Sequence, residues 1–175
     1  MNQIKRNDLI RARKMCYLFR FIDDLSAIND GGDFENNFKD IYPEELQLGK
    51  ENQNSSEASF LDLSIQIHNN KFSVGLYDKR DSFPFNIVRM PYKSSNLPSN
   101  IFYSAIGAET LRIAKASNNA DSFFSAVQPL LTRMMKQGAN RHRLSHVVCK
   151  FYNRHNLYFK SITGNLQELI SVLFK

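Results

Sequence analysis

Two adjacent carboxylates, Asp23 and Asp24, interrupt the apolar stretch LFRFIDDLSAI at residues 18–28. Neighbouring like charges repel each other, and holding them together is costly unless water, a base or a cation neutralises them. Mg²⁺ or Mn²⁺ is the natural partner, because both ions prefer carboxylate oxygens and keep waters or phosphates as other ligands. In nucleotidyl transfer, two such ions activate a 3′-hydroxyl and stabilise a leaving pyrophosphate. The pair therefore indicates a divalent-cation site, with an ordinary acidic surface turn as the alternative.

The segments around the pair are predicted to form a β-hairpin. Residues 15–22 are mostly apolar and aromatic, which is typical of a strand, and residues 25–28 form the returning strand. Neighbouring side chains within one strand point to opposite faces, whereas at a hairpin tip both carboxylates can point toward one space. The Asn, Asp and Gly residues of segment 29–33 predict a turn, and a helix follows over residues 34–42, ended by Pro43.

Farther along, the chain changes from strands to helices. Residues 60–67 alternate strictly between apolar and polar side chains, and the pattern returns over residues 71–79 after an Asn-Asn turn. An irregular connector with three prolines follows at residues 81–99. Beyond it, apolar residues recur at helical spacing in four segments, three of which have an expected N-cap residue: Asp121, Asn140 and Asn165. Strands gathered early and helices gathered late predict an α+β fold.

The formal net charge of +6 is divided unevenly along the 175 residues. Residues 23–98 hold seven Lys and Arg against thirteen Asp and Glu, whereas residues 99–175 hold ten against three. Residues 1–22 are also basic. An acidic centre with basic flanks suits a polyanion that must approach metal-holding carboxylates, although ordinary solvated faces give the same composition.

The cysteines and the apolar runs exclude several classes of protein. Cys16 and Cys149 are far apart and have no ligand-like spacing, so neither a disulfide framework nor a zinc site is indicated. The N-terminus lacks the apolar part of a signal peptide, and no apolar run approaches the ~20 residues that span a bilayer. We therefore expect an intracellular protein of the nucleus or cytoplasm with no membrane partner.

The stretch FRFIDDLSAI resembles the polymerase hairpin of reverse transcriptases, in which an aromatic residue, any residue and two aspartates lie between two strands. Phe21 stands where the family most often has Tyr. Residues 34–49 look like the helix and strand that follow this hairpin. Residues 58–117, which include the sequence FLD, resemble the next segment of Penelope-like retroelements, and residues 125–144 are similar to the helix and turn after it. The resemblance covers roughly residues 15–155.

This resemblance implies a fragment of an RNA-directed DNA polymerase in two parts. The C-terminal part of the palm would occupy residues 1–98, and an all-helical thumb would occupy residues 99–175. Asp23 and Asp24 would be the catalytic metal ligands, with Asp23 bridging the ions, and the partners would be an RNA template, a DNA primer and a dNTP. The residues expected to contact primer and template are Phe21, Arg112, Arg141, Arg143, Lys150 and Arg154.

The chain departs from the family pattern upstream of the hairpin. A reverse transcriptase needs a further metal-binding aspartate from an earlier strand, and fingers that contact the incoming nucleotide, but only 22 residues precede Asp23. We therefore expect the isolated chain to be inactive unless a partner supplies the missing palm and fingers. Two other functions stay open: a non-catalytic nucleic-acid-binding remnant of a retroelement, and an unrelated Mg²⁺-dependent nuclease. The nuclease would need further acidic residues near Asp23, for which the candidates are Asp30, Asp33 and Glu35.

Overall fold

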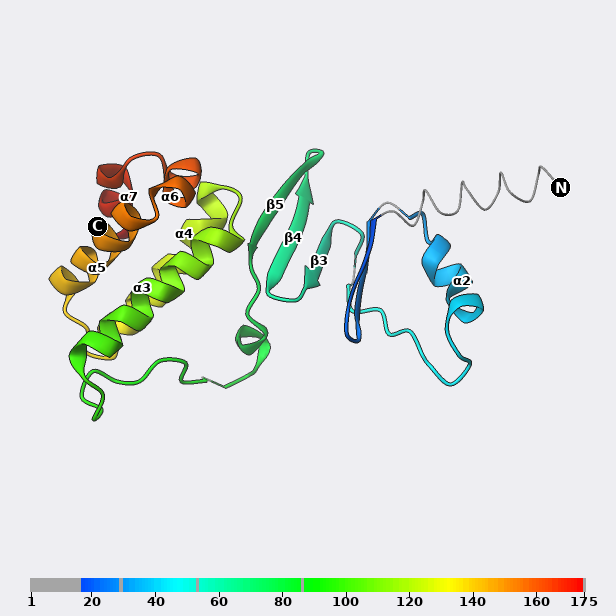
Figure 1. Ribbon diagram of the computed structural model, residues 1–175, viewed down its shortest axis with the longest axis horizontal. Coiled ribbons are helices and arrows are strands. Elements are labelled where there is room, and N and C mark those ends of the chain that lie inside the picture. The colour runs from blue at the N-terminus through cyan, green and yellow to red at the C-terminus, as the bar shows by residue number, and fades with distance from the viewer. Residues whose placement is uncertain (1–16, 29, 53, 86, 175) are drawn as a thin grey trace. The chain divides into compact units, whose positions relative to one another are not determined.

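The computed structural model describes residues 17–28, 30–52, 54–85 and 87–174, and it divides into two compact units at Leu61 and Asp62 (Figure 1). Small antiparallel sheets come first in the chain and helices dominate its C-terminal part, which confirms the predicted α+β class. Residues 15 and 16 of the predicted first strand, and Asn29 of the predicted turn, lie outside the described residues.

The first unit contains the predicted hairpin. Strand β1 (Leu18–Phe21) pairs antiparallel with β2 (Asp24–Ala27), and the last residue of β1 lies opposite the first residue of β2. The two-residue turn is therefore Ile22–Asp23. This confirms the predicted hairpin with both aspartates at or beside its turn, although the turn itself comes one residue earlier than Asp23–Asp24. The sequence favours aspartate at both turn positions because Asp tolerates turn geometry. The strand register instead places Ile22 there, with φ at +54°.

Helix α2 (Asp33–Ile41) begins after a turn that Asp30 and two glycines shape. The Asp30 carboxylate accepts hydrogen bonds from the backbone N–H groups of Gly32 (3.2 Å) and Phe34 (3.0 Å). Gly32 has φ +82°, the left-handed conformation that glycine adopts without steric cost. Phe34 and Phe38 form the buried side of α2, so the predicted helical spacing is confirmed.

A second hairpin stands at the start of the second unit. Strands β4 (Leu63–His68) and β5 (Lys71–Leu76) pair antiparallel, which confirms the predicted hairpin. The strand predicted over residues 60–67 is interrupted by a turn at residues 61–62, and the strand predicted over residues 71–79 ends at Leu76. Asn69 and Asn70 form the turn with φ values of +50° and +59°, which is the type I′ geometry that Asn accepts well. A shorter strand, β3 (Glu57–Phe60), precedes this hairpin in the chain and belongs to the first unit.

Helices make up most of the second unit. After a short 3₁₀ turn, η2 (Lys79–Ser82), the α-helices among the described residues are α3 (Ser99–Ala116), α4 (Ala120–Lys136), α5 (Arg141–Arg154), α6 (Asn156–Thr163) and α7 (Leu166–Leu173). The sequence predicts four helices here, and the structure has a fifth, α6, which follows α5 after His155 and is not predicted. Within the part of the chain that the structure describes, no helix is both long and apolar enough to cross a bilayer.

Asparagine side chains cap three of these helices. Asn140 accepts a hydrogen bond from the Arg143 N–H (3.1 Å), and Asn165 accepts one from the Glu168 N–H (2.8 Å), so both predicted caps are confirmed. The predicted cap Asp121 is wrong. Asn119 has the extended backbone of an N-cap, and its side chain accepts from the backbone N–H of Ser122, which leaves Asp121 inside the first turn of α4.

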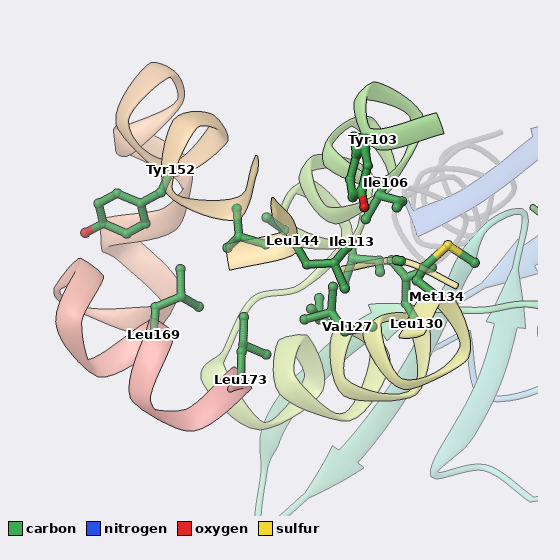
Figure 2. Packing of buried hydrophobic residues seen from close by; sticks show 14 of the residues in the cluster. Tyr103, Ile106, Ile113, Val127, Leu130, Met134, Leu144, Tyr152, Leu169 and Leu173 are labelled. Atoms are coloured by element: carbon green, nitrogen blue, oxygen red, sulfur yellow. The ribbon is translucent and has the colours of Figure 1, made fainter. Parts of the chain in front are cut away.

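The hydrophobic core of the second unit lies between the helices. Figure 2 shows side chains from α3, α4, α5 and α7 converging on one another, among them Ile106, Ile113, Val127, Met134, Leu144 and Leu169. Each of these six is almost completely buried. Strand β5 packs against α3 and α4, so the β4–β5 hairpin and the helices form one compact body.

The loop between α3 and α4 is joined to the edge of β5 by one asparagine. The Asn118 backbone N–H donates to the Val74 carbonyl (3.1 Å), and its Oδ1 accepts from the Val74 N–H (2.8 Å). Its Nδ2 donates to the carbonyl of Phe72 (2.8 Å). These bonds satisfy backbone groups that a bare strand edge would leave unpaired.

Candidate functional site

The hairpin of the first unit presents both candidate metal ligands to solvent. Asp23 is the second turn residue and Asp24 begins β2, and both side chains are exposed. Directly opposed residues of an antiparallel pair lie on one face of the sheet, so Asp24 shares its face with Phe21. Phe21 is 54% exposed. Among the described residues, neither carboxylate has a hydrogen-bond or ion-pair partner.

Arg20 braces the turn without neutralising the aspartates. Its Nε donates to the carbonyl oxygen of Ile22 (2.9 Å), and its Nη1 donates to the Tyr42 hydroxyl (3.3 Å). The guanidinium also lies over the Tyr42 ring, 5.4 Å from the centroid, which is a cation–π contact. The cation nearest to the pair in the sequence is thus bound to the turn and to the end of α2. The sequence signal for this role is an arginine inside an otherwise apolar strand.

Ile22 stores backbone strain beside the carboxylates. Its φ of +54° is in the left-handed region, where a β-branched residue is an outlier. Such a conformation costs on the order of 1–3 kcal/mol and persists only when the surrounding structure enforces it. Here the enforcing contacts are the β1–β2 ladder and the hydrogen bond from Arg20 to the Ile22 carbonyl.

Two other acidic residues near the hairpin in the sequence have separate roles. Asp30 caps the turn before α2, and Glu35 pairs with Lys50 at 3.4 Å. Within the described ranges, no group of three or more His, Cys, Asp or Glu side chains gathers where it could hold a metal ion. The nuclease hypothesis therefore gains no additional acidic ligand. Two carboxylates fit part of the coordination shell of one Mg²⁺ or Mn²⁺ ion, which waters and phosphates would complete.

The basic candidates on α5 separate into two groups. At 100° per residue, Arg143, Lys150 and Arg154 fall within an arc of about 40° on one side of the helix, whereas Arg141 lies on another side. Arg141 donates to the backbone carbonyl of Phe174. We call Arg143, Lys150 and Arg154 the α5 stripe, and its members are spaced about 10 Å and 6 Å along the helix axis.

Two members of the α5 stripe are exposed and have no partner in the described part of the chain: Lys150 and Arg154. Arg143 stacks over the Tyr103 ring at 5.0 Å from its centroid, and the Tyr103 hydroxyl in turn accepts from the Asn140 N–H (2.9 Å). The start of the stripe is therefore fixed against α3, while its far end is exposed to solvent.

Arg112, the remaining basic candidate, is engaged in ion pairs. On α3, it pairs with Glu109 (3.0 Å) and with Asp62 (2.9 Å), and Glu109 is nearly buried. A phosphate would have to compete with two carboxylates for this guanidinium. The structure thus brings Phe21, Asp23 and Asp24 together on the hairpin, and the α5 stripe together on α5. No protein-family model, curated protein or solved structure matches this chain.

Proposed function

We propose that the chain is a fragment of a reverse transcriptase, an RNA-directed DNA polymerase most similar to those of Penelope-like retroelements. The hairpin unit would be part of the palm, and the helices would form the thumb. The whole enzyme would transfer a nucleotide from a dNTP to the 3′-hydroxyl of a primer on an RNA template. The observation that carries the proposal is the tight β1–β2 hairpin, with exposed Asp23 in its turn and exposed Asp24 next to it at the start of β2.

The chemistry of the hairpin supports a metal-binding role. Asp23 and Asp24 would hold Mg²⁺ or Mn²⁺, which supplies charge neutralisation for the attacking and leaving oxygens of nucleotidyl transfer. Arg20 keeps its guanidinium on Ile22 and Tyr42, so it does not compete with a cation for the two carboxylates. Phe21 shares a face with Asp24 and offers an exposed ring beside it for the end of a primer–template duplex.

Mn²⁺ binding tests the metal site directly. In NMR spectra, substoichiometric Mn²⁺ should broaden the backbone resonances of Asp23 and Asp24 first. The chain has a matched control in the same unit, because Glu44 and Glu45 are also adjacent and exposed. The double variant Asp23→Asn/Asp24→Asn should lose the broadening, and Glu44→Gln/Glu45→Gln should keep it. Equal broadening of both acidic pairs would contradict the proposal.

The isolated chain should not incorporate nucleotides. One pair of carboxylates cannot position two ions, and the described residues bring no third ligand to it. We expect no dNTP incorporation on a primed RNA template with Mg²⁺ or Mn²⁺ present. Incorporation that disappears in Asp23→Ala would show that the chain is sufficient for catalysis.

A non-catalytic nucleic-acid-binding remnant is the second candidate function, and the α5 stripe favours it. Lys150 and Arg154 point away from the core and have no partner in the described residues. Contacts between such side chains and phosphates give affinity without sequence preference. On this proposal, the chain binds duplex nucleic acid through the helices whether or not the hairpin holds a metal ion.

Salt dependence of duplex binding separates specific contacts from general charge. Each phosphate contact on B-form DNA contributes a slope of about −0.9 to log K against log salt. The variant Lys150→Gln/Arg154→Gln should weaken binding to all sequences alike and flatten the slope by about 2. Lys136→Gln/Lys160→Gln removes the same charge from exposed positions on α4 and α6 and should change the slope less. Equal slopes for the two variants would make the α5 stripe an ordinary solvated surface.

A further inference from the structure

A two-part cleft in the second unit is not used by either proposed function. One part, of about 430 Å³, lies between β4–β5 and α3–α4, and the other, of about 280 Å³, lies under the connector that follows η2. The two parts adjoin one another, because Asp78, Arg89 and Arg133 line both of them. We call the smaller part the connector cleft.

The floor of the connector cleft is a fixed ionic network. Asp78 accepts from Arg80 Nε (2.7 Å), from Arg80 Nη2 (3.1 Å) and from Arg89 Nη1 (2.6 Å). Arg89 also pairs with Glu109 of α3. The Asp78 side chain accepts the Arg80 N–H as well (3.2 Å) and so caps η2. Because each of these side chains is held by at least one other, the cleft is preorganised.

The rim of the connector cleft carries two exposed aromatic rings. Phe83 is 46% exposed and Phe85 is 62% exposed, and their ring centroids lie 5.4 Å apart. Pro84 separates them in the chain, and the Phe83 N–H donates to the Arg80 carbonyl (3.3 Å), so η2 fixes the first ring beside the arginines. Large apolar rings left in water next to arginine donors are typical of sites that stack bases.

We propose that the connector cleft binds an unpaired nucleotide of a single-stranded nucleic acid. A base would stack on the Phe83–Phe85 pair, and the adjoining phosphate would accept hydrogen bonds from Arg80. Arg80 uses Nε and Nη2 on Asp78, which leaves the two N–H groups of Nη1 as donors. This site goes beyond the proposed functions, which concern the hairpin carboxylates and a duplex bound by α5.

The combination of donors and rings favours a nucleotide over a peptide. Every nucleobase has a flat face that stacks without sequence preference, and each unit of a strand brings one phosphate beside one base. The connector cleft matches this repeat with aromatic rings and a guanidinium side by side. A peptide carries neither a phosphate for the Arg80 donors nor a flat base on each of its units for the Phe83–Phe85 pair.

The test compares single-stranded and duplex binding in the full chain. Fluorescence anisotropy with labelled oligothymidylate should show that Phe83→Ala/Phe85→Ala binds the strand at least about tenfold more weakly than the parent chain, because base stacking contributes on this scale. Duplex affinity should stay unchanged in that variant. Phe72→Ala is the matched control, since Phe72 is an equally exposed ring of the same unit that does not line the cleft. It should bind both probes as the parent chain does.

A second measurement keeps the test independent of folding. A strand carrying 2-aminopurine should lose fluorescence on binding the parent chain through stacking, and it should keep its fluorescence with Phe83→Ala/Phe85→Ala at saturating protein. Circular dichroism melting should coincide for the variants, since both rings are exposed. Unchanged single-strand affinity in the double variant would overturn the proposal. Competition by thymidine monophosphate as strong as by the strand itself would overturn the strand as the source of the nucleotide.

Discussion

The first unit, which carries the β1–β2 hairpin, and the second unit, which holds helices α3 to α7, differ most in how many apolar side chains they bury. Among the described residues of the first unit, the buried hydrophobic residues are Phe34 and Phe38. The second unit instead joins residues from α3 to α7 in one continuous hydrophobic cluster. Burial of apolar surface is the main source of stability, so most of the stability of the molecule resides in the helices. The candidate metal ligands stand on the hairpin, whose conformation rests on local hydrogen bonds.

Mutations in the two units should therefore act on different properties of the molecule. Asp23, Asp24 and Phe21 are exposed, so replacing them removes chemistry without opening a cavity. A replacement inside the helical cluster does the reverse.

A cavity in the helical core should have the largest effect. Leu144 is completely buried in α5, and Leu144→Ala should lower the free energy of unfolding of the second unit by about 2–5 kcal/mol. Leu157→Ala is the control in the same unit, because the Leu157 side chain is 84% exposed. Urea unfolding followed by circular dichroism measures both, and a similar small effect for the two would mean that the helices are loosely packed.

Close packing between α3 and α5 gives the next effect. A Cβ added at Gly107 would lie 2.3 Å from a ring atom of Phe151, so the ring would have to move. Gly107→Ala should destabilise the second unit by about 1–3 kcal/mol through overpacking, reduced by the better helix propensity of Ala. Gly49→Ala in the first unit meets no atom within 4 Å and should leave stability nearly unchanged. Stabilisation by Gly107→Ala in thermal unfolding would contradict the close approach of the two helices.

Relief of strain should strengthen the hairpin. Ile22→Gly removes the steric cost of φ +54° and should stabilise β1–β2 by about 1 kcal/mol after the entropy cost of glycine is subtracted. Amide hydrogen exchange at the β1 and β2 positions should slow accordingly. Ile22→Val keeps the β-branched strain and should exchange as the parent does. Faster exchange in Ile22→Gly would show that the Ile22 side chain itself holds the turn.

Acid sensitivity of the ionic network is the smallest expected effect. Burial opposes the ionised form of Asp78, but hydrogen bonds from Arg80 and the charges of Arg89 and Arg80 outweigh it and lower the pKa of Asp78. A carboxyl with a lowered folded-state pKa stabilises the fold above its unfolded-state pKa, and this contribution is lost as the pH falls through the folded-state pKa.

Thermal unfolding between neutral pH and values below about 4 should therefore show a steeper loss of stability for the parent chain than for Asp78→Asn. Asp40→Asn, which replaces an exposed carboxylate of the first unit, should follow the parent. Parallel pH profiles for the parent and Asp78→Asn would show that the ionic network around Asp78 does not contribute to the stability of the fold.

Local patterns predict much of this fold, and long-range contacts account for what they miss. The period of the apolar residues predicts the β4–β5 hairpin and the buried apolar face of α5, because each pattern depends only on residues that are close in the sequence. The turn at Ile22–Asp23 escapes prediction because strand register overrides the turn preference of aspartate. Likewise, the contact of Arg20 with Tyr42 joins residues 22 positions apart, and no local pattern contains it.

Asn118 has a consequence for how this molecule behaves in crowded solution. A free strand edge offers a row of unpaired N–H and C=O groups on which another chain can add a strand, the first step toward domain swapping or fibrils. By pairing with Phe72 and Val74, the Asn118 backbone and side chain occupy that part of the β5 edge as a neighbouring strand would. This one loop asparagine thereby blocks the backbone groups of Phe72 and Val74 from pairing with another chain, at positions where neither a charged residue nor a proline protects the strand.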